Sequence, residues 1–383
     1  TMRPEEAIQR VDSVAKGEGE RIWPQVLADA QRGALKRVYV GEPANMADIP
    51  PARHDLLTSG YACGSIQTTR GCPLNCSFCS VSAFNGSHYR HRPIENVVRE
   101  FGSIQEKHVL VVDDNLIGIR DEEIARAKDL FRAMIQANLR KKWIGQATIN
   151  MADDEELLTL AFGAGCMGVF IGLESPTVEG LAEVGKKFNR RNGRDFKASV
   201  RRIQRHGIQV VGSFIMGLDT DEPGIGQQTA AAADHYGVDV LSVLFLTPLP
   251  GTRLWNKMVA EDRIAANTFP DDWKYYTLTF PVARYRHLSS TEILKELNSC
   301  NRAFYSLWRI LRRVWANFRP GRRPLVTLVS NLSFRNNSRL DRKAYREFNT
   351  SHGTTKLLMH PAESRHVCQR PTAQEATGLP ADS

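Results

Sequence analysis

The most constraining feature of this sequence is a regular alternation of strand-like and helix-like segments between residues 64 and 261. Apolar, strand-like runs lie at 65–69, 108–112, 143–149, 167–173, 208–216 and 238–246. Helical patterns lie near 94–105, 122–138, 154–164, 194–206, 222–236 and 253–260. Strands that alternate with helices predict βαβ units around a parallel sheet. Six units fit either an open doubly wound sheet or a six-fold barrel, and both bind ligands at the carboxyl ends of their strands.

The regions on either side of this alternation differ from it in composition. Residues 1–60 carry two short amphipathic helical patterns and a Pro-rich crossing. Because Thr1 precedes Met2, we expect the natural chain to begin upstream. Residues 266–350 are aromatic and then basic, with long helical periodicity, and residues 351–383 turn polar, which predicts a disordered tail. The sequence therefore predicts four parts, at 1–60, 61–265, 266–350 and 351–383.

The net charge of +9 is concentrated in one segment. Residues 301–347 hold twelve Lys or Arg against two Asp or Glu, or +10, so the rest of the chain is close to neutral (9 − 10 = −1). This distribution excludes a uniformly basic nucleic-acid binder, and any electrostatic partner is expected at this segment. No apolar stretch is long enough for a transmembrane helix, and the first residues do not resemble a signal peptide. These features predict a cytoplasmic protein.

Three of the seven cysteines are clustered directly after the first strand-like run, as C-x3-C-x2-C in "GCPLNCSFC". An odd number of cysteines in a cytoplasmic chain favours metal binding over disulfides. Cys72, Cys76 and Cys79 can cap three corners of a cubane iron–sulfur cluster and leave the fourth iron open to a small chelating molecule. A zinc site is the alternative, if Cys63 or His88 supplies a fourth ligand.

The C-x3-C-x-aromatic-C motif after the first strand of a six-fold βα pattern resembles the radical S-adenosylmethionine superfamily. The resemblance implies that Cys72, Cys76 and Cys79 hold a [4Fe–4S] cluster. It implies that S-adenosylmethionine chelates the open iron and is reductively cleaved to a 5′-deoxyadenosyl radical. Phe78, in the aromatic position, would support the adenine pocket. The resemblance covers roughly residues 60–265 and implies a partial (β/α)6 TIM-like barrel and a reducing partner such as flavodoxin or ferredoxin.

The same resemblance suggests further cofactor contacts at strand ends. Asp113 or Asp114 in "VVDDNLIG" could accept a hydrogen bond from the cofactor amine, although a helix N-cap or turn carboxylate explains either residue equally well. Glu174 in "GVFIGLES" could hold the ribose or the amine. Cys166 and Cys300 have no metal partners by spacing and are expected to be buried apolar thiols. The sequence identifies no catalytic acid or base.

Two glycines and two polar residues complete the candidate cofactor site. Gly212 and Gly217 in "VVGSFIMGL" resemble the glycine motif that lies beside the adenine, but glycines in a strand also mark bulges or tight packing. Gln146 and Thr148 in "GQATIN" are expected at the mouth of the same sheet.

The subclass is indicated by three segments outside the cysteine motif. "GEGE" (Gly17–Glu20), "TPLPGT" (247–252) and "DDWKYYTLTF" are similar to the subfamily in which a cobalamin-binding domain precedes the radical core. The resemblance implies that residues 1–60 are the remnant of a Rossmann-like cobalamin domain. Because no histidine precedes His54, the signature loop of that domain is absent, and cobalamin binding depends on residues upstream.

Members of this subfamily include hopanoid and other lipid-modifying methylases. The resemblance therefore predicts cobalamin-dependent C-methylation of a small apolar, lipid or natural-product substrate. The alternatives are a radical enzyme that does not methylate or does not use cobalamin, a methylthiotransferase-like enzyme acting on RNA, and a non-enzymatic iron–sulfur electron carrier.

The basic segment 304–323 interleaves aromatic residues with arginines. Phe304, Trp308, Trp315 and Phe318 alternate with arginines along one helical pattern. The pattern fits an amphipathic helix that covers the barrel with its arginines solvated. It also fits an interfacial helix on anionic lipid at the inner face of the membrane, or an RNA-contacting helix. No recognisable RNA-binding appendage follows the core, which counts against nucleic acid.

Overall fold

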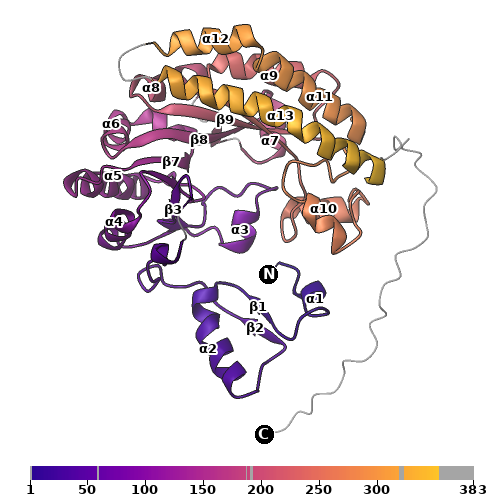
Figure 1. Ribbon diagram of the computed structural model, residues 1–383. Coiled ribbons are helices and arrows are strands. Elements are labelled where there is room, and N and C mark those ends of the chain that lie inside the picture. Colours follow the sequence, from indigo (N-terminus) through magenta and orange to yellow (C-terminus); the bar gives the residue numbers. More distant parts are fainter. Residues whose placement is uncertain (1, 58–59, 187, 190–192, 319–322, 353–383) are drawn as a thin grey trace.

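The computed structural model describes residues 2–57, 60–186, 188–189, 193–318 and 323–352, except for the side chain of residue 339 (Figure 1). Its centre is a sheet with the order β10-β9-β8-β7-β6-β3, in which all neighbours pair in parallel. These strands are β3 (Gly64–Ile66), β6 (His108–Val111), β7 (Lys142–Ala147), β8 (Cys166–Glu174), β9 (Gln209–Met216) and β10 (Val240–Phe245). Each strand lies within or beside a strand-like run of the sequence, so the predicted alternation is confirmed.

The strand order decides between the two architectures that the sequence allowed. Each strand of the sheet lies beside the next one along the chain, with no reversal. Right-handed crossovers that always step in the same direction place their helices on one face of the sheet. A doubly wound sheet needs a point at which the strand order reverses. The sheet is therefore a partial (β/α)6 barrel, as the resemblance implied.

The helices between the strands cover the outer face of this sheet. They are α4 (Ile94–Ser103), α5 (Asp121–Gln136), α6 (Glu155–Gly163), α8 (Phe196–Arg205) and α9 (Ile225–Tyr236). The main hydrophobic core lies between these helices and the sheet. Trp143 of β7, for example, stacks on Phe131 of α5 with ring centroids 5.5 Å apart. Its indole N–H donates to the Ala164 carbonyl at 2.9 Å.

Short elements join the strands to these helices. They are β4 (Thr69–Arg70), α3 (Ser80–Phe84), β5 (Arg90–His91), η2 (Ile149–Asp153), α7 (Val178–Glu183), α10 (Arg253–Ala260) and η4 (Asp271–Tyr275). β4 and β5 pair antiparallel, so the segment between them leaves and rejoins the barrel at one point.

The inner face of the sheet is open in the part of the chain that the structure describes. Side chains of a strand alternate between its two faces, so the neighbours of buried Val109, Val111 and Trp143 point inward. Among these, Leu110 is 42% exposed, Val112 46% and Ile144 36%. The barrel therefore presents an apolar inner surface.

The N-terminal residues form a small βαβ unit. Its elements are β1 (Val14–Lys16), α2 (Gly19–Gln31) and β2 (Val38–Val40), flanked by α1 (Pro4–Ala7) and η1 (His54–Leu56). β1 and β2 pair in parallel. In Figure 1 the unit lies below the barrel, beside the cysteine-bearing segment. A βαβ unit is the building block of Rossmann-like domains, which is compatible with the predicted remnant.

Three helices form the C-terminal extension. They are α11 (Ser290–Phe304), α12 (Leu307–Ala316) and α13 (Pro324–His352), and they lie over α9 and the β10 edge (Figure 1). α13 continues to His352, two residues into the predicted tail, and residues 353–383 lie outside the described part. The predicted four-part division stays a prediction. No helix in the described part is long and apolar enough to cross a membrane.

Candidate active site

The three clustered cysteines lie on the segment between β4 and α3, which follows the carboxyl end of β3. Cys72 and Cys76 are buried and Cys79 is partly buried. The segment begins with a bend at Gly71, whose φ is +84°. A Cβ atom at Gly71 would lie 2.2 Å from the His88 carbonyl oxygen, so only glycine fits this bend. The backbone geometry therefore depends on the residue that precedes the first cysteine.

The two carboxylates after β6 hold this segment in place. Asp113 is fully buried and accepts hydrogen bonds from the Thr68 amide and hydroxyl at 2.5 Å each and from the Thr69 amide at 3.1 Å. Asp114 accepts from the Gly71 amide at 3.3 Å and from the Asn85 side chain at 3.0 Å. Asp113 thus has the turn-carboxylate role that the sequence offered as the alternative. A contact of either residue with the cofactor stays a prediction. Asp114 is the better candidate for such a contact, because it binds the backbone directly before the first cysteine.

The cysteine segment lies near a buried charge pair that the sequence did not predict. Glu174 ends β8 with a φ of +67°, a left-handed conformation that is uncommon for a non-glycine residue. Its carboxylate lies 3.0 Å from the ammonium of Lys186, which is only 8% exposed. A Cβ atom at residue 172 would lie 2.2 Å from the Glu174 carboxylate, so Gly172 leaves the space for the pair.

Electrostatics at this site favour a cationic Lys186 beside the three thiols. Burial alone would lower the pKa of Lys186, but Glu174 and the thiols of Cys76 and Cys72 raise it above its usual value. Burial raises the pKa of each clustered thiol, that of Cys76 to about 12, and the Lys186 charge acts in the opposite direction. A buried cation in this position stabilises thiolates, the form of cysteine that binds metal.

The three thiols lie on one segment, and in a cubane each cysteine binds a different iron. A zinc ion instead needs its ligands to converge on one position, with sulfur ligands about 2.3 Å from the ion. Among the described residues, no group of three or more His, Cys, Asp or Glu side chains is placed for a metal ion. The choice between a cluster and zinc therefore rests on the sequence motif and on the comparisons with known proteins.

The remaining predicted cofactor residues have identifiable structural environments. A Cβ atom at Gly212 would lie 2.8 Å from Val238, and one at Gly217 would lie 2.5 Å from the Tyr285 ring. Tight packing thus accounts for both glycines. Gln146 lies on the open inner face, while Thr148 is buried. Phe78 is partly buried against the core. The cofactor roles of these residues stay predictions.

The two isolated cysteines that were expected to be buried lie in the core. Cys166 and Cys300 are fully buried, and burial raises the pKa of each thiol to about 12. Both thiols are therefore protonated at neutral pH.

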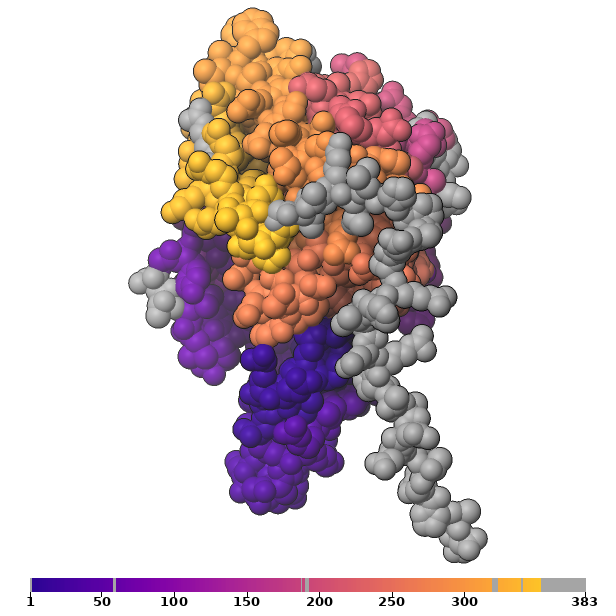
Figure 2. Space-filling view, turned by 90° about the vertical axis from the view of Figure 1, so that its right-hand side faces the viewer, coloured from indigo at the N-terminus to yellow at the C-terminus, as the bar shows by residue number. Residues whose placement is uncertain are grey.

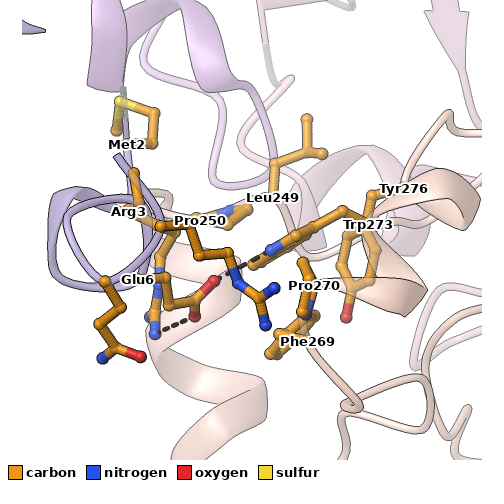
Figure 3. Close-up of a pocket in the computed structure, with 12 residues that line it drawn as sticks. Met2, Arg3, Glu6, Leu249, Pro250, Phe269, Pro270, Trp273 and Tyr276 are labelled. Carbon is orange, nitrogen blue, oxygen red and sulfur yellow. Dashed lines mark hydrogen bonds and ion pairs between the residues drawn. The ribbon is translucent and has the colours of Figure 1, made fainter. Parts of the chain in front are cut away.

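A cavity of about 440 Å³ lies between α1, the loop after β10 and η4 (Figure 3). Its aromatic wall includes Trp273 and Tyr276, and its opposite wall is α1, whose Glu6 accepts a hydrogen bond from the Trp273 indole at 3.0 Å. The loop after β10 supplies Leu249 and Pro250 to the cavity wall. Arg253, the first residue of α10 directly after that loop, donates to the Asn75 carbonyl at 2.6 Å. One side of the cavity wall is thus connected to the cysteine segment.

Comparison with known proteins agrees with this geometry. Residues 66–224 match the profile of the radical SAM superfamily, a range that contains all three clustered cysteines and Glu174. Residues 66–224 therefore form a radical SAM domain, as the cysteine motif predicted. Radical SAM domains use a [4Fe–4S] cluster and S-adenosylmethionine, so the chain carries the core of an enzyme of that class.

Relatives of this chain include methyltransferases. It is 28% identical to the bacteriochlorophyllide d C-12(1)-methyltransferase of Chlorobaculum tepidum, over 82% of this chain and 69% of the relative. It is 31% identical to the hopanoid C-2 methylase of Rhodopseudomonas palustris, over 54% of this chain and 40% of the relative. The solved structure of the cobalamin-dependent radical enzyme OxsB, with aqua-cobalamin bound, aligns over 92% of this chain and 61% of that chain. The TM-score is 0.60 at 16% identity, which shows a shared fold.

Proposed function

We propose that this protein is a cobalamin-dependent radical S-adenosylmethionine methyltransferase that methylates carbon in a small apolar molecule of lipid or natural-product type. The observation that carries the proposal is the group of three thiols, two of them buried and one partly buried, near the Lys186–Glu174 pair at the carboxyl ends of a partial barrel. The relatives named for the methylation of hopanoids and bacteriochlorophyllides support the substrate class, because both names denote apolar molecules of lipid or natural-product type.

Cys72, Cys76 and Cys79 would hold the [4Fe–4S] cluster. When bound, the cluster and S-adenosylmethionine supply one-electron chemistry that removes a hydrogen atom from an unactivated carbon. Lys186 compensates negative charge at the thiolates. The amino-acid portion of S-adenosylmethionine carries an amine and a carboxylate, which are complementary to the Glu174 carboxylate and the Lys186 ammonium. We assign these two residues to its recognition, with Asp114 supporting the segment from the other side.

The apolar inner face supports an apolar substrate. Leu110, Val112 and Ile144 point away from the helices and toward the interior of the barrel. Apolar walls exclude water, which an enzyme that handles reactive radicals requires. One wall of the aromatic cavity of Figure 3 is connected to the cysteine segment, and we propose this cavity as a second part of the substrate path.

We assign the methyl carrier to cobalamin. The βαβ unit of residues 14–40 is then part of the Rossmann-like domain that holds it. The electron comes from a reducing partner such as flavodoxin or ferredoxin. The protein contacts the membrane peripherally, at its inner face.

The decisive experiment is anaerobic reconstitution with iron and sulfide, followed by reduction in the presence of S-adenosylmethionine. The protein is expected to carry one [4Fe–4S] cluster and to release 5′-deoxyadenosine. Replacement of Cys72, Cys76 or Cys79 by Ala should abolish both the charge-transfer absorbance and the cleavage. Cys63→Ala, in the same region but outside the motif, is the matched control and should retain both. Stoichiometric zinc without iron after anaerobic purification would contradict the cluster assignment.

Methyl transfer is tested separately with S-adenosylmethionine that carries a deuterium-labelled methyl group. The full natural chain, supplied with cobalamin and an apolar lipid extract, should transfer the label to carbon. If the label is transferred equally well without cobalamin, the methyl group does not pass through methylcobalamin, and that part of the proposal is wrong. Cleavage without any label transfer would favour the non-methylating alternative.

A further inference from the structure

The helix α12 is oriented with its apolar face toward solvent. Trp308 and Trp315 are 76% and 79% exposed, and Leu311 lies between them on the same face. We call the exposed residues Leu307, Trp308, Leu311, Trp315 and Phe318 the α12 apolar face. A helix that only covered the barrel would bury such side chains. The expectation of a covering helix with solvated arginines is met only in part, because Ile310 packs into the core and Arg312 is exposed, whereas Arg313 is buried.

The opposite face of α12 combines apolar residues with a buried arginine and is bound to the body of the protein: Ile310 lies in the main core and Val314 packs against it. Arg313 is buried and donates to the Phe304 carbonyl at 2.6 Å and to the Asn331 side chain at 3.0 Å. Arg309 and Arg313 form ion pairs with Asp234 of α9 at 2.7 Å and 3.0 Å. These contacts fix the rotation of α12 about its axis. The outward position of the two tryptophans is thus determined by the buried arginine.

The charge around the α12 apolar face has one sign. From residue 297 to residue 340 the sequence contains nine arginines and no Asp, Glu or Lys. Arg302 and Arg312 are exposed at the edges of the face; the Arg312 side chain is 59% exposed, and its ion pair with Asp234 is long, at 3.7 Å. Exposed aromatic side chains beside arginines are typical of helices that lie in a membrane interface.

The fold disfavours two other occupants of this face. The N-terminal βαβ unit lies at the opposite end of the molecule from α12 in both views, so it does not cover this face (Figures 1 and 2). A second copy packed symmetrically on the same face would bring two arginine-rich edges together, which like charges disfavour. An anionic surface is complementary to both the apolar residues and the arginines.

We propose that the α12 apolar face docks on an anionic lipid surface, with Trp308, Leu311 and Trp315 inserted at the headgroup boundary. The inference deepens the membrane contact of the proposed function and identifies the surface that makes it. It revises the sequence expectation in one respect, because Phe304 and Arg313 of the segment are buried and do not reach the lipid. Docking here holds the barrel at the membrane, where an apolar lipid substrate is dissolved.

Vesicle binding by the full chain tests this proposal without any cluster or cofactor, so failure here is distinct from failure of the radical chemistry. Flotation is measured with vesicles of phosphatidylglycerol and phosphatidylcholine and with phosphatidylcholine alone. We expect binding to the anionic vesicles at low salt, little binding to the neutral ones, and loss at high salt. Lipids brominated on their acyl chains should quench tryptophan emission on binding.

Two pairs of variants separate the α12 apolar face from general surface properties. Trp308→Ser/Trp315→Ser should weaken vesicle binding by about tenfold or more, because binding scales with the apolar area that is inserted. Trp23→Ser is the matched control, since Trp23 is 59% exposed on α2 at the other end of the protein and should leave binding unchanged. Arg312→Gln should reduce binding to anionic vesicles, whereas Arg120→Gln, an exposed arginine at the start of α5, should not.

Three results would overturn the proposal. The first is absence of binding to anionic vesicles at low salt. The second is equal loss of binding in the Trp23→Ser control. The third is a dimer in solution that Trp308→Ser/Trp315→Ser converts to a monomer, which would assign the α12 apolar face to a second copy of the chain. Circular dichroism of each variant verifies that the fold is retained.

Discussion

At the residue scale, Asp221 binds the backbone of the glycine bend after β9, and its ionisation makes the stability of the protein depend on pH. It is buried and accepts hydrogen bonds from the Gly217 and Leu218 amides at 2.8 Å and 3.0 Å. Burial raises the pKa of its carboxyl group to about 6, with a smaller contribution from the charge of Glu183. The folded state then holds a proton that the unfolded chain releases, so stability falls as the pH rises from about 4 to about 6.

We predict that Asp221→Asn removes this fall, which is worth about 2 to 3 kcal/mol at about 1.4 kcal/mol per pKa unit. The free energy of unfolding, measured in urea from pH 4 to pH 7, checks it. Asp219→Asn is the control. Burial alone would raise the Asp219 pKa, but Arg263 and Lys257 hold it down to about 2. The stability that Asp219 adds is lost only below about pH 4, so this variant should shift the profile without changing its slope above that pH. Equal slopes in the wild type and Asp221→Asn would contradict the assignment.

The role of a residue could be predicted where a sequence motif determines its chemistry. It could not be predicted where the role depends on which residues the fold brings together. The spacing of Cys72, Cys76 and Cys79 predicted their shared segment. Lys186 was missed because nothing in "GKKFN" distinguishes a lysine that the fold buries beside the thiols. Asp113 and Asp114 are adjacent in sequence but hold different parts of the chain, and only coordinates separate their roles.

At the scale of elements, the N-terminal βαβ unit is connected to the cysteine segment by ion pairs that centre on one buried carboxylate. Glu18, between β1 and α2, is buried and forms ion pairs with Arg70 and Arg90, which flank the segment on β4 and β5. It also accepts a hydrogen bond from the Ala44 amide at 2.8 Å. The "GEGE" motif thus has a structural function in this chain, because its first Glu holds the base of the cysteine segment.

We predict that Glu18→Gln loosens this base, because a buried ion pair that loses one partner leaves the other charges uncompensated. Amide hydrogen exchange of residues 71–79 should become faster by about tenfold or more, as expected for a loss of local stability of this kind. Glu20→Gln is the control, since Glu20 pairs only with Arg70 and is more exposed. Unchanged exchange in Glu18→Gln would show that the β4–β5 pairing alone holds the segment.

Elements were predicted well in type and less well in orientation. Hydrophobic periodicity located all six strands and the helices between them. The same periodicity in α12 identified an amphipathic helix but did not determine which face is turned inward. Asp234, more than seventy residues earlier in the chain, determines it by attracting Arg309 and Arg313.

At the scale of the whole molecule, the fold class could be predicted from the alternation of strands and helices. The way in which the exposed edge of the sheet is covered could not be predicted from it. A sheet that does not close into a full barrel has exposed edges, and β10 is one of them. Tyr305 satisfies this edge, because its hydroxyl donates to the Leu241 carbonyl at 2.5 Å and accepts from the Leu241 amide at 3.0 Å. The bond spans sixty-four residues, a separation over which sequence patterns carry no information.

The C-terminal extension therefore completes the barrel sheet as well as carrying α12, and this predicts a graded loss of stability. Tyr305→Phe leaves a buried amide and a buried carbonyl of β10 unpaired, at a cost of about 2 to 4 kcal/mol in the free energy of unfolding. Tyr276→Phe is the matched control, because its hydroxyl donates one bond, to the Ala266 carbonyl at 2.8 Å, and should cost about 1 kcal/mol. Urea unfolding of the two variants measures the difference. Equal losses would mean that helix packing alone protects the β10 edge, and the extension would then be a cover and not a part of the sheet.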